Sequence, residues 1–131
     1  MSDTPPMTPG TFGWNELVTT DTEACEAFFT RLMGWTTDTN PMEEGGVYTF
    51  FKQGDRPVGG MMSMQSLGLK DVPSHWMAYL TVENVDAACA RCRELGGKIL
   101  MEPMDVKDIG RFAIIADPSD AALGLAQYFS S

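Results

Sequence analysis

Histidine, cysteine and basic residues are all scarce in this sequence, which has one histidine, three cysteines and nine lysines and arginines among 131 residues. A single histidine limits schemes in which a histidine activates a serine or cysteine nucleophile. The 18 acidic residues bring the formal net charge to −9. Nucleic acids and anionic membranes bind basic surfaces, so we expect neither of them as a partner.

Long apolar runs are also missing, and none approaches the ~20 residues that a membrane-spanning helix requires. Residues 1–10 are polar and proline-rich, and they lack the basic start and apolar run of a signal peptide. We therefore expect a cytoplasmic protein. The odd number of cysteines agrees with reduced thiols in such a compartment.

Two of the cysteines, Cys89 and Cys92, form a C-x-x-C motif. The motif lies within a helical pattern, and no second pair of cysteines is present to complete a zinc site. We expect both side chains to face the core, where free cysteine is commonly found. Redox or metal chemistry at this motif is the alternative.

A unit of about 60 residues occurs twice in the chain, each time in the order strand, helix, strand, strand, strand. The first copy is predicted at 12–19, 20–34, 35–39, 46–53 and 57–64, and the second at 75–83, 84–95, 98–101, 110–116 and 122–128. A nearly constant offset of 63 or 64 residues relates caps, glycines and strand residues: Asp21 to Asn84, Gly34 to Gly97, Tyr48 to Phe112 and Gly60 to Gly124. Such self-similarity at one period indicates an internal repeat.

The repeat predicts an α+β fold of tandem βαβββ modules in a single domain over 11–131, after a flexible tail at 1–10. Module one covers 11–64, a linker covers 65–74, and module two covers 75–129. Each helix covers one face of its sheet, and the other face needs a second module or a ligand to bury it. We expect a curved eight-stranded mixed sheet, a cup or half-barrel with two outer helices. A concave surface of this kind is where small molecules bind.

Alternation along the first strand of each module predicts which side chains face the cup. They are Trp14, Glu16 and Val18 in module one, and Met77, Tyr79 and Thr81 in module two. Glu16 is an acid on an otherwise apolar wall, and a buried carboxylate must be hydrogen-bonded or paired. A structural hydrogen bond and a role as ligand contact or general base are both consistent with this position.

Three segments in this order and spacing resemble one known superfamily: WNELVTTDTEACEAFF followed by LMGW, VENVDAAC with ELGGK, and GRFAIIADPSDAALGLAQ. They are similar to the vicinal-oxygen-chelate superfamily, also called the glyoxalase/bleomycin-resistance/extradiol-dioxygenase family. The resemblance covers roughly residues 11–129 and is closest to small glyoxalase-like members.

The resemblance also implies where a metal would be held. Metal-dependent members offer a histidine or similar residue in the first strand of each module, which corresponds here to Trp14 and Met77. They usually offer a glutamate in the last strand of a module, which corresponds to Gly124 and, by the repeat, to Gly60. None of these four side chains can ligate a hard divalent ion, and a catalytic site needs about three such ligands. We therefore expect no metal and no cofactor.

His75 lies two residues before Met77 and shares its face of the strand. Together with Glu16 it would still lack a third ligand. We expect His75 at a solvated strand end, with a role at the rim of the pocket, including proton transfer, as the alternative.

The function implied is a glyoxalase/bleomycin-resistance-like protein that binds or sequesters an apolar or aromatic small molecule in the cup. The residues expected to contact the ligand are Trp14, Glu16, Met62, Met77, Tyr79, Phe112 and Arg111. The alternative is a glyoxalase-like lyase or isomerase, or a dioxygenase-related enzyme, with Glu16 as base or with a relocated metal site. Exposed strand edges and the shared fold also favour a homodimer.

Overall fold

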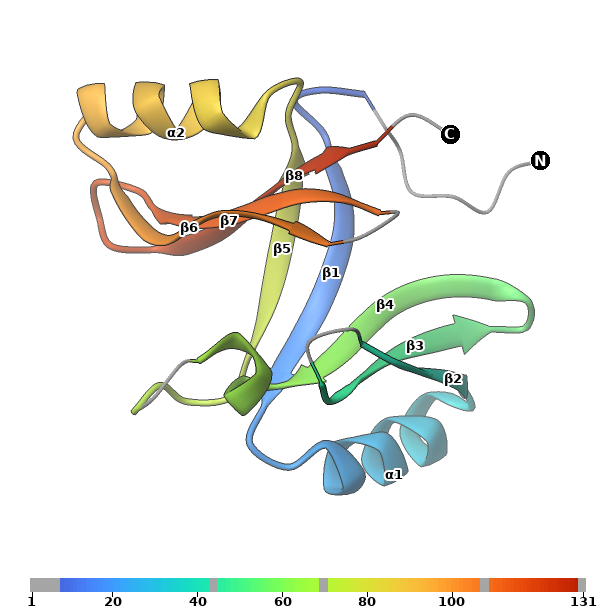
Figure 1. The fold of residues 1–131 in the computed structure, drawn as a ribbon. Helices are drawn as coiled ribbons and strands as arrows, with labels where there is room; N and C mark the ends of the chain where they lie inside the picture. The colour runs from blue at the N-terminus through green and yellow to red at the C-terminus, as the bar shows by residue number, and fades with distance from the viewer. Residues whose placement is uncertain (1–7, 43–44, 69–70, 107–108, 130–131) are drawn as a thin grey trace. The chain divides into compact units, whose positions relative to one another are not determined.

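The computed structural model describes residues 8–42, 45–68, 71–106 and 109–129, so most of the predicted tail lies outside the described residues. The elements in chain order are β1 (Phe12–Thr19), α1 (Thr22–Met33), β2 (Thr36–Pro41), β3 (Val47–Gln53), β4 (Arg56–Ser63), the 3-10 helix η1 (Met64–Leu67), β5 (His75–Thr81), α2 (Val85–Glu94), β6 (Lys98–Val106), β7 (Gly110–Ala116) and β8 (Ala122–Tyr128) (Figure 1). The contacts divide the described residues into two compact units, 14–76, and 77–129 together with 8–13.

Both modules have the same strand order and the same directions of pairing. Module one has the order β2-β3-β4-β1, and module two has the order β5-β8-β7-β6. The first and last strands of each module, β1 with β4 and β5 with β8, are parallel, whereas the remaining pairs are antiparallel. The predicted α+β class, with tandem βαβββ modules, eight strands of mixed direction and two helices, is confirmed.

The strand pairing shows the repeat as well, because equivalent residues of the two modules pair with equivalent glycines. Glu16 pairs with Gly60 in module one, and Tyr79 pairs with Gly124 in module two. The helix caps recur as well, because the side chain of Asp21 accepts from the backbone N–H of Ala24 at 3.0 Å and that of Asn84 accepts from Ala87 at 2.9 Å. Each cap satisfies a backbone donor that the first turn of a helix leaves free.

Two strands extend further than the sequence predicts, and both include a proline. β2, predicted at 35–39, ends at Pro41, and β6, predicted at 98–101, runs through Pro103 to Val106 with two irregularities in its register. Both strands lie at the end of their module's strand order. Proline lacks a backbone N–H and is tolerated at such edges, so a strand there can contain a proline.

The core of module two lies between α2 and one face of its sheet. Its buried members are Val85, Cys89, Ala113 and Leu125. Burial raises the pKa of the Cys89 thiol, and the Cys92 sulfur lies 3.8 Å from the carbonyl oxygen of Lys98. Cys89 therefore packs in the core as expected.

The core of module one is built differently, because none of the 12 residues of α1 is fully buried. Leu17, Phe51 and Met61 are buried under α1, and Cys25 and Phe29 are the helix residues that pack against them. The helical spacing of six apolar residues predicts one apolar stripe along α1, made of Ala24, Cys25, Phe28, Phe29, Leu32 and Met33. The structure divides it into an inward set and an outward set, since six apolar residues cover more of a helix than one sheet face can bury.

Candidate functional site

In module one, the predicted ligand residues lie on the face of the sheet opposite α1, which we call the helix-free face. Cross-strand pairing places Glu16, Gly60 and Phe50 in one row. Val18, Met62 and Tyr48 form the next row. Side chains in such rows share one face of a sheet. The structure therefore brings Glu16 and Met62 together with Trp14, which lies two residues before Glu16 on the same strand.

Tyr48 fills the space above Gly60. A Cβ atom on Gly60 would overlap the Tyr48 hydroxyl. The indole N–H of Trp14 donates to the same hydroxyl at 2.8 Å, and the Phe50 ring lies 5.0 Å from Tyr48 and 6.0 Å from Trp14. The sequence reasoning missed Tyr48 and Phe50 as members of this face. The repeat could have found Tyr48, because the offset of 64 matches it to Phe112, which was selected.

Module two repeats this arrangement with a different tyrosine. Tyr79, Gly124 and Ile114 form one row, and a Cβ atom on Gly124 would overlap the Tyr79 ring. The Phe112 ring lies 6.0 Å from Tyr79. Met77 and Tyr79 are both buried. The structure thus places Met77, Tyr79 and Phe112 on the helix-free face of module two.

The two modules differ at one equivalent position. Glu16 stands in module one where Tyr79 stands in module two, 63 residues later, and each is paired across the strands with its glycine. Because Glu16 does not cover Gly60 with a ring, Tyr48 does so from β3. Glu16 is only 6% exposed. A carboxyl group buried beside aromatic rings is costly unless polar groups satisfy it, which makes it the chemically distinctive residue of these faces.

These faces do not fit a metal ion of the kind the superfamily uses. The four corresponding positions hold indole, thioether and two glycines, and tyrosines cover both glycines. Across the described parts of the chain, no three His, Cys, Asp or Glu side chains are grouped so that they could hold a metal. A hard divalent ion would therefore find no set of side-chain ligands at these four positions.

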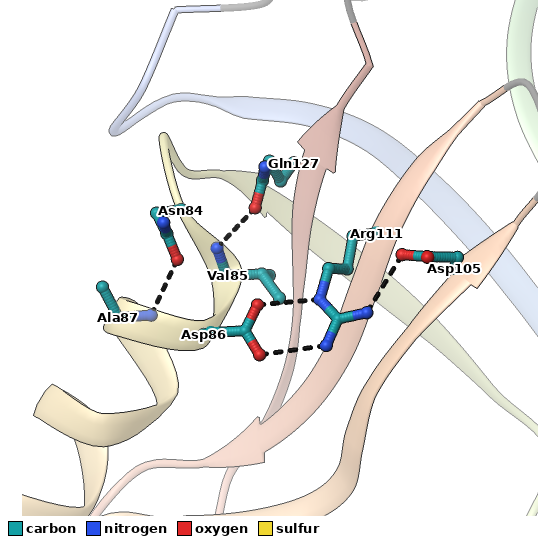
Figure 2. A network of polar contacts seen from close by, with 7 residues as sticks. All are labelled: Asn84, Val85, Asp86, Ala87, Asp105, Arg111 and Gln127. Carbon is teal, nitrogen blue, oxygen red and sulfur yellow. Dashed lines mark hydrogen bonds and ion pairs between the residues drawn. The ribbon is translucent and has the colours of Figure 1, made fainter.

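Arg111 lies on the helix-bearing face of module two, where it holds the start of α2 (Figure 2). Its guanidinium donates to both carboxylate oxygens of Asp86, at 2.7 and 3.0 Å, and to Asp105 at 3.0 Å. The hydrogen bonds from Arg111 lower the pKa of Asp86, and the two carboxylates raise the pKa of Arg111. Beside this pair, Gln127 accepts from the backbone N–H of Val85 at 2.8 Å.

This placement of Arg111 differs from the expected one. Arg111 precedes Phe112, and neighbouring residues of a strand point to opposite faces. With Phe112 on the helix-free face, Arg111 has to point toward α2. A ligand-binding role of Arg111 stays a prediction, and a ligand would have to compete with two carboxylates.

His75 is half-buried at the start of β5, with its Nδ1 atom 2.8 Å from the carbonyl oxygen of Pro73. Its predicted role at a pocket rim stays untested. A surface hollow near His75 in the sequence is lined mostly by the linker 65–74, and none of the predicted ligand residues lines it. Its lining residues are Thr20, Met64, Gln65, Asp71, Val72 and Pro73.

A sequence model of the Glyoxalase/Bleomycin resistance protein/Dioxygenase superfamily matches residues 11–124. The chain belongs to this superfamily. The predicted resemblance is therefore confirmed.

Within the described residues, neither helix has the length and apolar character needed to cross a bilayer.

Curated relatives in the superfamily are considerably longer than the segment they share with this chain. CFP32 of Mycobacterium tuberculosis, which is named as a glyoxylase, is 38% identical over 112 residues, or 86% of this chain and 42% of the relative. The anthracycline biosynthesis protein DnrV of Streptomyces peucetius is 31% identical over 132 residues, 89% of this chain and 46% of the relative. The chain thus spans less than half of the length of these relatives.

Solved structures share the fold at low sequence identity. Methylmalonyl-CoA epimerase from Mycobacterium tuberculosis has a TM-score of 0.61 at 13% identity, covering 91% of this chain and 88% of that one. The hypothetical protein BH1468 from Bacillus halodurans C-125 has a TM-score of 0.65 at 9% identity, covering 92% and 96%. This likeness concerns the fold alone.

Substitution of Gly124 tests the contact between glycine and tyrosine. We expect Gly124→Ala to lower the free energy of unfolding by about 1–3 kcal/mol, because the new methyl group would overlap the Cδ1 and Cε1 atoms of the Tyr79 ring. The loss should shrink in a Tyr79→Leu background, which chemical denaturation of all four proteins measures. Gly59→Ala is the control, since its Cβ would meet the carbonyl oxygen of Asn15 at 3.2 Å and not Tyr79, so its loss should be the same in both backgrounds. An equal loss in both backgrounds would contradict the contact.

The ion pair of Asp86 predicts a pH-dependent stability. Its pKa is lower in the folded protein than in the unfolded chain, so the pair stabilises fully above the unfolded value, about 3.9. The stabilisation disappears as the pH falls through the lower, folded value. We expect Asp86→Asn to melt at a lower temperature than the unsubstituted protein at neutral pH and to converge with it in acid. Glu94→Gln, which removes an exposed pair with Arg91, is the control. A difference that persists unchanged in acid would contradict this assignment.

Proposed function

We propose that this chain is a metal-independent, small-molecule-binding member of the superfamily that takes up an apolar, planar aromatic ligand. The observation that carries the proposal is the aromatic packing at Gly60 and Gly124, positions where the resemblance implies metal ligands, with Tyr48 over Gly60 and Tyr79 over Gly124. The cup, as a shared space of the two modules, stays a prediction. The proposed ligand contacts lie on the helix-free face of each module.

The chemistry of these faces favours an aromatic ligand. Trp14, Tyr48 and Phe50 meet at edge-to-face angles in module one, and Tyr79 and Phe112 do so in module two. Such rings stack on planar apolar molecules. Met62 adds a side chain that adapts to irregular shapes. The similarity to DnrV, named for anthracycline biosynthesis, supports a polycyclic aromatic ligand.

The metal-independent part of the proposal is tested by elemental analysis of the purified protein. We expect far less than one equivalent of zinc, iron, manganese or nickel per chain, and a melting temperature that a chelator leaves unchanged. One equivalent of metal that survives dialysis, and whose removal lowers the melting temperature, would overturn it.

Ligand binding is tested by titrating the protein with daunorubicin, a polycyclic anthracycline, and following its fluorescence. We expect saturable binding that weakens about tenfold or more in Trp14→Ala, because a stacked aromatic contact is lost. Trp35→Leu is the matched control, since Trp35 packs with Phe51 and Phe29 on the helix-bearing side. Equal weakening in both variants, or no saturable binding, would contradict an aromatic site on the helix-free face.

Glu16 supports a second candidate, a lyase or isomerase that uses this carboxylate as a general base. The specific observation is its burial beside an aromatic cluster. If the protein turns over a substrate such as the adduct of methylglyoxal and glutathione, Glu16→Gln should reduce kcat by about 100-fold or more, as loss of a general base does. Turnover that persists in Glu16→Gln would remove the base role.

We further propose that the protein uses no cofactor, is cytoplasmic and forms a homodimer. Neither nucleic acid nor membrane is a partner in this proposal. The formal net charge of −9 supports the exclusion of polyanionic partners.

A further inference from the structure

The outward side of α1 carries apolar side chains that the described structure leaves uncovered. Phe28 is 57% exposed and Leu32 is 61% exposed. Together with the exposed Ala24 they follow one another at intervals of four residues, which places them in one row along the helix. The equivalent helix α2 has no such row of large apolar residues. Uncovered apolar rows of this kind mark interaction surfaces.

A second row runs beside the first and carries opposite charges at its two ends. Its members, Glu23, Ala27 and Arg31, are also exposed and also four residues apart. The acid lies in the first turn of α1, and the base lies in the last turn. The small Ala27 in the middle allows close approach of another helix.

We propose that these two rows form a docking surface for the α1 helix of a second copy of this chain, packed antiparallel about a two-fold axis near Ala27 and Phe28. In this arrangement Phe28 and Leu32 of each copy cover the apolar row of the other. Glu23 of one copy meets Arg31 of the other, and the pair occurs twice because the interface is self-complementary. The antiparallel direction also places opposite ends of the two helix dipoles side by side.

The charges favour a second copy over an unrelated acidic partner. A chain with a net charge of −9 repels itself at long range, so self-association requires a local match such as the Glu23–Arg31 pair. A parallel arrangement would place like charges together and loses this match. Both curated relatives are more than twice as long as the segment they share with this chain, which leaves room in each for a second unit of this size.

This inference deepens the homodimer of the proposed function by naming its surface, and it does not depend on the ligand. Sedimentation equilibrium of the full chain over a range of concentrations provides the test. We expect a dimer for the unsubstituted protein and at least ~100-fold weaker association for Phe28→Glu, because a charge would be buried at the centre of the contact. Leu100→Glu is the control, since Leu100 is 52% exposed on β6, outside this surface, and should leave the dimer intact.

Charge exchange tests the antiparallel direction. Glu23→Arg and Arg31→Glu should each weaken association by about tenfold, through repulsion at two symmetric positions. The double variant should restore association to nearly the original strength. Circular dichroism and melting curves confirm folding, and Leu32→Ser serves if Phe28→Glu does not fold.

Three results would overturn the proposal. A monomer at about 100 µM, within the Kd range of weak specific association, would remove the second copy. A dimer that Phe28→Glu and Leu32→Ser leave unchanged would keep the homodimer but remove α1 as its surface. A double charge variant that stays as weak as the single variants would refute the antiparallel pairing.

Discussion

A tyrosine ring packed against the bare backbone of a glycine is the contact on which both helix-free faces depend. In module two the ring belongs to Tyr79, directly across the parallel strands from Gly124, and in module one the hydroxyl of Tyr48 takes the corresponding place above Gly60. Only glycine leaves this volume free. The same contact therefore explains the aromatic character of these faces and why no carboxylate can stand where the superfamily resemblance implies a metal ligand.

The two helices of the repeat serve their modules differently. α2 buries Val85 and Cys89, and Arg111 ties its first turn to the sheet through Asp86. α1 buries no residue completely and keeps Phe28 and Leu32 on its outer side. The two modules thus share their strand order and helix caps but differ in how far their helices are buried. Burial depends on the size and position of a few side chains.

Local signals predicted most of the fold. The caps Asp21 and Asn84 stand where the sequence placed them, because a cap depends on the next three residues. Alternation placed Trp14 and Glu16 on the face opposite the helix for the same local reason. The ends of β2 and β6 lie beyond the predicted ranges, at Pro41 and Val106. Whether a strand can contain a proline depends on whether it lies at an edge, and the local sequence does not show that.

The sequence by itself determined the repeat, the order of its elements and the equivalence of Gly60 and Gly124. Each of these follows from neighbouring residues or from comparison of the chain with itself. Only the tertiary structure decided which tyrosine covers each glycine and where the guanidinium of Arg111 points. Glu16 occupies in module one the place that Tyr79 fills in module two, so Tyr48 reaches across from another strand. Such contacts join residues on different strands, and the register of those strands is set only when the whole sheet forms.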